Sequence, residues 1–359
     1  MNLTPYEDTR YPIYDIDLSL PPEERWAEFA CKETKNIKRL LGDVVDMCGE
    51  HIESSPLPFR PFIRAVCYGA GTWVLGPLVN TVAGMFGEDY VAEIRSIADY
   101  SGVPLSHLML GNLMYDLFQM GGIPGLGCSS VSCDIDGNPT LVRNMDWVWP
   151  RTTGKHSRVI RFHDGSDHYM SVSVLGCVGV LSAMCPGKWA VTINQAPTAG
   201  ASPSLFQWPV LQRLRSVCDQ MGSYRQLVSG LQEYETMASF FAHVVGTKPG
   251  EHSVITGLGS DFRRRKIKGG SLVQTNHFIG HSDLEEHNNP EEWEDEDGQR
   301  WYCDSRAREK NLVEQLKRLP ASLGEARKKI CTSVVSTDDT VQQMVFQPAS
   351  GYSRVWLRR

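Results

Sequence analysis

The spacing of apolar residues divides the chain into a helical first third and a strand-rich remainder. Over residues 23–50 apolar side chains recur three or four positions apart, which predicts one long amphipathic helix. The same spacing predicts helices over residues 90–100 and 105–117. The chain before Gly121 is therefore expected to be mainly helical.

Residues 65–87 carry no charged side chain. A stretch of this length is sufficient for a membrane span. Its many glycines, with Pro77 and Asn80, depart from the sustained Leu, Ile and Val content of such a span. We expect instead two buried or half-exposed helical segments broken at Gly76-Pro77. An apolar surface for a lipid-like substrate, or a peripheral membrane contact over 65–87, is the functional alternative.

Alternating apolar and polar positions dominate the chain after a Gly-rich connector at 121–127. Strands are expected at 157–162, 169–174, 179–183, 189–194, 252–257, 270–274, 341–347 and 354–357. Helices are expected between them at about 208–221, 223–234 and 305–317. Strand runs interrupted by packed helices predict an α+β layered domain.

Two strand-like runs on either side of Gly137-Asn138 predict a β-hairpin. Counting outward from this turn places Asp146 or Trp147 opposite Cys128, to within a residue or two, and Cβ atoms at opposite positions lie about 4.5–5.5 Å apart. The hairpin would thus gather a thiol, a carboxylate and the guanidinium of Arg143. Arg143 and Asp146 are an odd number of residues apart, so a regular strand points them to opposite faces. Both can serve one site only if the strand ends or bulges between them.

Composition bounds the class of protein. The chain has 359 residues, enough for one large domain or two, and a formal net charge of −6, which argues against a nucleic-acid partner. The ten cysteines show no zinc-ligand spacing, so neither a metal nor another cofactor is expected. The first 25 residues are polar, without the apolar core of a signal peptide. A cytoplasmic protein with free thiols is the default expectation.

A cysteine nucleophile needs a base and a site for the developing oxyanion. His277 beside Asn276 could supply a papain-like base, although the sequence alone does not bring it to a cysteine. A second solution uses the α-amino group of an N-terminal nucleophile, whose ordinary pKa is about 7.7–8.0. For Cys128 this requires cleavage of the Gly127–Cys128 bond, which the glycine-rich connector favours.

The sequence around Cys128-Ser129-Ser130 and Val142-Arg143-Asn144-Met145-Asp146 resembles the N-terminal cysteine nucleophile (Ntn) hydrolases. These include choloylglycine hydrolases, penicillin acyltransferase, acid ceramidase and the N-acylethanolamine-hydrolysing acid amidase. Gln274-Thr275-Asn276-His277 and Asp304-Ser305-Arg306 are similar to segments of the acid ceramidase branch, as is the strand and Trp-containing helix of residues 14–26. Ser129 departs mildly from the more frequent Thr, and the absence of a signal peptide departs from lysosomal members.

The resemblance implies a role for each residue of the hairpin. Cys128 would be the nucleophile through its thiol and the general base through its freed amine. Asp146 would hold that ammonium or thiol in place. Arg143 would stabilise the thiolate and orient the substrate.

Three residues beyond the hairpin complete the implied site. Asn276 would donate its side-chain N–H to the oxyanion, and Asn194 falls where related enzymes place a second polar residue. Arg306 would complete the charge balance, with Arg308 as a competitor because of the long insertion after Asn276.

The resemblance implies a four-layer αββα Ntn-hydrolase sandwich with a mainly helical N-terminal segment. Residues 1–127 would form the alpha subunit after cleavage and residues 128–359 the catalytic beta subunit, with the two fragments remaining associated. The implied activity is hydrolysis of lipid-like N-acyl amides, of N-acylethanolamine, N-acyl amino acid or ceramide type, through an acyl-thioester. An acyltransferase of penicillin acyltransferase type and a non-catalytic lipid-binding relative are the alternatives.

Overall fold

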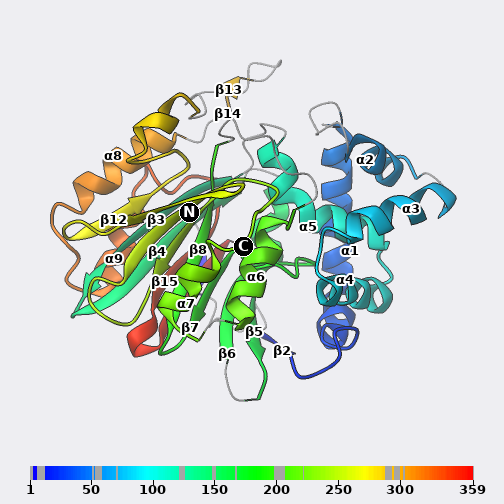
Figure 1. Ribbon diagram of the computed structural model, residues 1–359, viewed down its shortest axis with the longest axis horizontal. Coiled ribbons are helices and arrows are strands. Elements are labelled where there is room, and N and C mark those ends of the chain that lie inside the picture. Colours follow the sequence, from blue (N-terminus) through cyan, green and yellow to red (C-terminus); the bar gives the residue numbers. More distant parts are fainter. Residues whose placement is uncertain are drawn as a thin grey trace.

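The computed structural model describes residues 3–5, 13–50, 52, 59–69, 72–120, 126–147, 151–165, 168–197, 207–220, 222–287, 293–294, 300–301 and 304–358. Most of the Gly-rich connector expected at 121–127 lies outside these residues. The described part contains two large β-sheets flanked by helices (Figure 1).

The first sheet has six strands in the order β1-β16-β15-β4-β3-β12. Their bounds are Leu3–Pro5 (β1), Tyr352–Arg358 (β16), Thr340–Gln347 (β15), Asn138–Trp147 (β4), Leu126–Ile135 (β3) and Ser271–Gln274 (β12). The second sheet has eight strands in the order β11-β10-β9-β8-β7-β6-β5-β2. Their bounds are Asp261–Lys266 (β11), His252–Leu258 (β10), Phe240–Val245 (β9), Trp189–Gln195 (β8), Ser182–Cys185 (β7), His168–Val174 (β6), Ser157–His163 (β5) and Ile13–Asp17 (β2).

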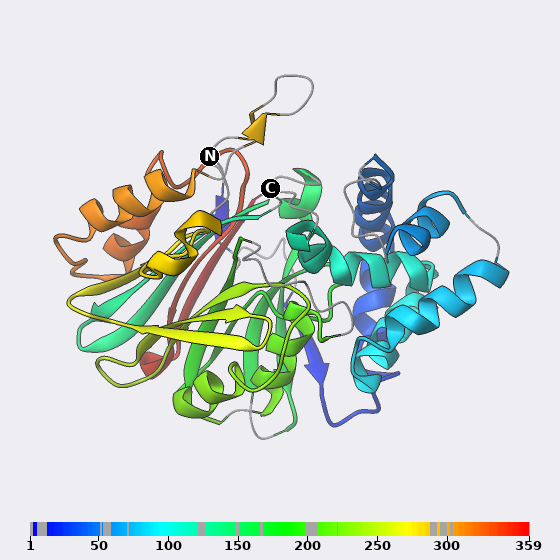
Figure 2. The ribbon, with the colours of Figure 1, turned by 45° about the horizontal axis from the view of Figure 1, so that its top comes forward.

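Apolar clusters identify the layers. Leu141, Met344 and Phe346 of the six-stranded sheet pack against Val172 and Val245 of the eight-stranded sheet. The other face of the six-stranded sheet packs against α8 (Ser305–Gln315) and α9 (Leu323–Ile330). The other face of the eight-stranded sheet packs against α6 (Val210–Gln220) and α7 (Tyr224–Gly230) and against the N-terminal helices. This is the predicted helix–sheet–sheet–helix arrangement, visible in Figures 1 and 2.

The described residues of the N-terminal segment form five helices, and the segment is mainly helical as predicted. They are α1 (Ala27–Glu50), α2 (Arg60–Cys67), α3 (Thr72–Ala83), α4 (Glu88–Ser101) and α5 (Leu105–Met120). The break expected at Gly76-Pro77 is wrong, because Pro77 lies inside α3 and the interruption falls between α2 and α3. Among the helices of the described residues, none combines the length and apolar character that crossing a bilayer requires.

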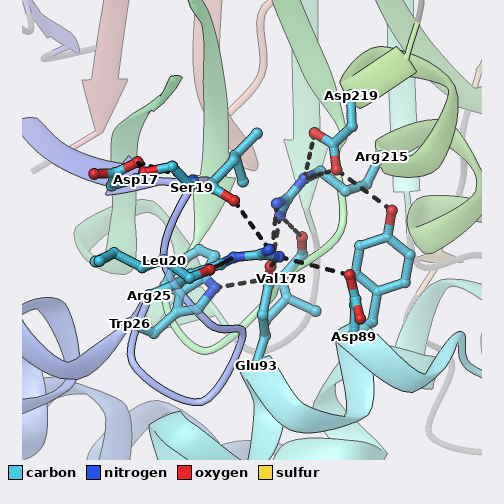
Figure 3. A network of polar contacts seen from close by, with 12 residues as sticks. Asp17, Ser19, Leu20, Arg25, Trp26, Asp89, Glu93, Val178, Arg215 and Asp219 are labelled. Atoms are coloured by element: carbon cyan, nitrogen blue, oxygen red, sulfur yellow. Dashed lines mark hydrogen bonds and ion pairs between the residues drawn. The ribbon is translucent and has the colours of Figure 1, made fainter. Parts of the chain in front are cut away.

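Buried charges join this helical segment to the β-rich part (Figure 3). Glu93 of α4 accepts from Arg215 of α6 at 3.3 Å and from Arg25 and Trp26 at 2.9 and 2.8 Å. Arg215 also bonds Asp219 at 2.8 Å. Strand β2 adds a second connection, since it pairs in parallel with β5 at the edge of the eight-stranded sheet. The helical segment is therefore fixed to the sandwich by polar contacts as well as by packing.

Candidate active site

The predicted hairpin is formed by β3 and β4. Its turn contains Asp136 and Gly137 with φ of 52° and 76°, the left-handed values that a two-residue hairpin turn needs. The register places Met145 opposite Cys128 and Asp146 opposite Gly127. The residue opposite Cys128 is thus one position before Asp146, within the residue or two that the count from the turn allowed.

The thiol of Cys128 lies on the face of the hairpin that points between the two sheets. It is fully buried, and Nη2 of Arg143 donates to its Sγ at 3.2 Å. The same guanidinium donates to Ser182 Oγ and to the carbonyl groups of Leu181 and Ile193. These contacts, to β8 and to the start of β7 in the facing sheet, fix Arg143, so a positive charge is held beside the thiol.

Asp146 points to the opposite face, toward α8 and α9. The expected bulge between Arg143 and Asp146 is wrong: β4 pairs regularly with β3, and the register shift lies in β15 between Thr340 and Gln342. Asp146 accepts from Thr340 Oγ1 at 2.5 Å. Burial raises the pKa of Asp146 to about 6, although Arg308 and the Thr340 hydroxyl act in the lowering direction.

The carboxylate of Asp146 lies against the backbone of Gly127. A Cβ atom at Gly127 would be 3.2 Å from both Cβ and Oδ2 of Asp146, closer than most Cβ contacts allow. A glycine at position 127 therefore lets the carboxylate approach the Gly127–Cys128 peptide. Asp146 thus lies beside the hairpin backbone at Gly127, while Arg143 donates to the thiol on the other face.

Asn276 lies directly beside the backbone of Cys128. Its Oδ1 accepts from the N–H of Cys128 at 2.7 Å and from Arg308 Nη2 at 2.9 Å. These two donors fix the orientation of the amide group. Its Nδ2 donates to the carbonyl of Gln195 at 2.8 Å. The structure therefore brings Asn276 to the predicted nucleophile, with its amide oxygen toward the group that cleavage would free.

The arginine of α8 that reaches the site is Arg308, and the assignment to Arg306 is corrected. Arg308 is 3% exposed and donates to the carbonyl of Cys128 at 2.6 Å and to Ser129 Oγ at 2.7 Å. Arg306 is exposed. The reason is helical periodicity. Arg308 comes three residues after Ser305 and therefore lies on the same face of α8, whereas Arg306 comes one residue after Ser305 and is turned away from that face by about 100°.

Asn194 and His277 lie near the hairpin without a hydrogen bond to Cys128 among those described. Asn194 is fully buried and donates to the carbonyl of Gln274 at 2.9 Å and to Ser130 Oγ at 3.2 Å. His277 bonds Ser305 and Glu309 rather than a cysteine. The papain-like pairing is therefore not formed in the described contacts.

Sequence reasoning missed the partners that orient the site. Ser182 and Thr340, which bond Arg143 and Asp146, carried no local signal because they come from strands distant in the sequence. A helical-spacing argument could have found Ser305 and Arg308 together. Among the described residues, no three His, Cys, Asp or Glu side chains form a group that could hold a metal ion.

Comparisons with known proteins find similar sequences and a similar fold. A family model described as the beta subunit of N-acylethanolamine-hydrolyzing acid amidase matches residues 9–59. Acid ceramidase of Rattus norvegicus is 24% identical over 270 residues, covering 68% of this chain and 63% of the rat protein. The N-acylethanolamine-hydrolyzing acid amidase of Caenorhabditis elegans is 24% identical over 254 residues, covering 68% of this chain and 66% of the relative.

The chain is a relative of the acid ceramidases and N-acylethanolamine-hydrolyzing acid amidases. The solved structure of the C. elegans N-acylethanolamine-hydrolyzing acid amidase ortholog superposes with a TM-score of 0.53 at 18% identity, covering 65% of this chain and all of that one. These matches confirm the resemblance drawn from the hairpin and the α+β fold. The chain spans less than two thirds of the length of the rat acid ceramidase.

Proposed function

We propose that the chain is a cysteine amidase that hydrolyses N-acyl amides through an acyl-thioester on Cys128, after cleavage of its own Gly127–Cys128 bond. The observation that carries the proposal is the pair of contacts on Cys128: Arg143 at 3.2 Å from the thiol and Asn276 at 2.7 Å from the backbone nitrogen. The Arg143 contact would stabilise a thiolate. The Asn276 contact would hold the α-amine of Cys128 once the Gly127–Cys128 bond is cut.

Cleavage of the precursor would be the first reaction of the site. The Cys128 thiol adds to the carbonyl of Gly127, the C–N bond breaks, and the nitrogen of Cys128 takes up the proton that the thiol released. Water then hydrolyses the resulting thioester, which leaves a carboxylate on Gly127 and a free amine and thiol on Cys128. The contact between Gly127 and Asp146 supports this step, since it places a titratable carboxyl beside the bond that breaks.

The hydrolytic cycle would then repeat the same chemistry on a substrate. The freed amine accepts the thiol proton, the thiolate adds to the amide carbonyl, and the ammonium returns the proton to the departing amine. Water, deprotonated by the same amine, releases the fatty acid from the thioester. The side-chain N–H of Asn276 is the proposed oxyanion donor, which requires it to exchange its present bond to the carbonyl of Gln195 for one to the oxyanion, and Arg143 holds the thiolate.

An apolar cavity of about 30 Å³ between helices α1 and α5 and the eight-stranded sheet favours a fatty acyl group as the part of the substrate that is recognised. Its lining includes Tyr115, Trp147 and Leu181, and the carbonyl of Leu181 accepts from Arg143. This volume holds only a few water molecules, far less than an acyl chain needs. An acyl chain would therefore enter by displacing side chains such as that of Met114, which also lines the cavity and is flexible. The names of the relatives, which are amidase and ceramidase, support the same substrate class.

Buried ion pairs support continued association of the two fragments after cleavage. Glu93 would belong to the first fragment and Arg215 to the second, and neither side chain is exposed. Glu33 and Arg158 form a similar pair at 2.6 Å. A peripheral membrane contact over 65–87 stays part of the proposal without a described contact to carry it.

The proposal is tested with a panel of N-acyl amides: N-acylethanolamines, N-acyl amino acids and ceramides. We expect fatty acid release by the wild-type chain that stops when Cys128 is alkylated and is absent in Cys128→Ala. Transfer of the acyl group to an added amine in place of water would favour the acyltransferase alternative. Absence of thiol-dependent release from every substrate would remove the amidase assignment.

A further inference from the structure

One face of α8 holds the loop that carries Asn276. Ser305 Oγ accepts from the backbone N–H of Asn276 at 2.7 Å, and Arg308 donates to its side-chain oxygen at 2.9 Å. Glu309 bonds His277, the next residue of the loop, at 2.9 Å. These three residues occupy positions i, i+3 and i+4 of the helix, which form one face.

The other two residues of this face are connected through His277. Its Nε2 bonds Glu309 Oε2, and its Nδ1 bonds Ser305 Oγ at 2.8 Å and Thr275 Oγ1 at 3.1 Å. An ionised carboxylate only accepts, so Nε2 carries a proton, and Nδ1 is left to fix the hydroxyl groups. A continuous chain of hydrogen bonds therefore runs from Glu309 through His277 and Ser305 to the N–H of Asn276.

This constellation of serine, histidine and glutamate is unsuited to nucleophilic catalysis. Ser305 is 8% exposed, and its oxygen already accepts the N–H of Asn276. His277 is also 8% exposed, so neither the hydroxyl nor the imidazole is open to a substrate. The array can instead fix the direction in which the loop presents the amide of Asn276 to Cys128.

We propose that His277 is a positioning residue, which acts through Ser305 to hold Asn276 against the Cys128 nucleophile. This inference rests on the proposed function, because it assigns the array to the reaction at Cys128. Glu309 of α8 bonds the imidazole directly, Arg308 of the same helix bonds the neighbouring Asn276, and Arg265 of β11 lines one groove with Glu309. The imidazole thus connects the site to a carboxylate that also faces an open groove lined by Arg265 and Lys268.

Two substitutions of His277 separate the roles of its two nitrogens. His277→Asn retains a polar atom near the Nδ1 position, toward Ser305, whereas His277→Gln retains one near the Nε2 position, toward Glu309. Ser305→Ala removes the acceptor itself. His281→Asn is the matched control, since His281 lies four residues further on and bonds Thr256 at 3.5 Å rather than the site.

The test combines kinetics on an N-acyl amide with hydrogen exchange of the Asn276 backbone amide in the full chain. We expect His277→Gln and Ser305→Ala to lower kcat about ten-fold at nearly unchanged KM, and His277→Asn to stay within about three-fold of the wild type. Exchange at Asn276 should rise at least about ten-fold in Ser305→Ala and His277→Gln, and His281→Asn should leave both quantities unchanged.

The inference is overturned if His277→Asn and His277→Gln lose kcat equally, or if exchange at Asn276 is unchanged in Ser305→Ala. A wild-type chain that hydrolyses no amide would instead remove the proposed function. In that case the exchange measurement still decides whether His277 and Ser305 hold the Asn276 backbone.

Discussion

The two faces of the β3–β4 hairpin carry different halves of the proposed chemistry. The face between the sheets holds Cys128 Sγ and Arg143, a thiol with a fixed cation. The face toward α8 holds Asp146 and Arg308, which lie along the backbone on either side of the Gly127–Cys128 peptide. Strand alternation separates the groups that would activate the thiol from those that would handle the scissile bond and the new amine.

The two faces also differ in the surroundings of their buried ionisable groups, Arg143 and Asp146. The two terminal nitrogens of the Arg143 guanidinium donate to neutral acceptors of three residues, Leu181, Ser182 and Ile193. Asp146 is buried with its pKa raised, so its ionised form is disfavoured by the fold. A buried carboxyl that costs stability when ionised is typical of a functional group rather than of a structural ion pair.

The largest expected effect, on the reactivity of Cys128, comes from the thiol face, the face between the sheets that holds Cys128 Sγ and Arg143. Arg143→Met should lower amide hydrolysis, and the rate at which iodoacetamide alkylates Cys128 at neutral pH, by about 10²–10³-fold, because the cation beside the thiolate is lost. Arg213→Met is the matched control, since Arg213 is a buried arginine that bonds the carbonyl of Gly230 away from the site. Equal alkylation rates in the Arg143 variant and the wild type would contradict the role of this face.

Substitutions on the backbone face, the face toward α8 that holds Asp146 and Arg308, should lower activity less. Variants of Arg308 and Arg306 should differ in activity and stability. Arg308→Met removes donors to the Cys128 carbonyl, Ser129 and Asn276, and we expect kcat to fall by about 10–100-fold with a loss of about 1–3 kcal/mol in stability. Arg306→Met, on the exposed side of the same helix, should change stability by less than about 0.5 kcal/mol. Denaturant unfolding and steady-state kinetics measure both, and a larger effect at Arg306 would reverse the assignment.

A smaller, pH-dependent effect belongs to Asp146. Its folded-state pKa of about 6 lies above the ordinary value of 3.8, so the folded chain binds the extra proton and this contribution to stability is present below about pH 4. The contribution is lost as the pH rises through about 6, which amounts to about 3 kcal/mol at most. Asp146→Asn stays neutral and should therefore be more stable than the wild type at pH 7 and similar at pH 4.

Chemical denaturation at both pH values, read beside the rate of chain cleavage, tests this prediction. The account expects the Asn variant to gain stability at pH 7 while losing cleavage. A variant that is less stable than the wild type at pH 7 would show that the carboxylate is a structural partner of Arg308 and Thr340.

The sequence predicted the chemistry of the thiol face better than that of the backbone face. Counting from the turn showed that Arg143 and Asp146 lie on opposite faces, but with Asp146 or Trp147 opposite Cys128 it left open which of the two shares the face of the thiol. The register decides for Arg143, and its contact with Cys128 is present. The bulge invoked to bring Asp146 to the same face occurs instead on β15, whose partnership no local pattern indicates. The choice of Arg306 rested on a motif interrupted by a long insertion, and helical periodicity would have favoured Arg308.

Two of the strands that escaped prediction, β9 and β11, did so for physical reasons. Every residue of β9 is buried, so its sequence lacks the alternation of a half-exposed strand. Strand β11 carries Arg263, Arg264, Arg265 and Lys266 at an edge of its sheet, where charge replaces the apolar pattern. Neither omission changed the predicted site residues, because these were chosen from the hairpin and from the segment around Asn276, not from β9 or β11.

The central claim is that Cys128 becomes an N-terminal nucleophile, and intact mass of the purified chain tests it most directly. The account predicts two fragments, the larger beginning at Cys128, whose masses sum to that of the precursor plus one water. Cys128→Ala should give one uncut chain, and Cys133→Ala, which alters a buried thiol on the other face of β3, should be cut like the wild type. One identical uncut mass in the wild type and Cys128→Ala would contradict the account.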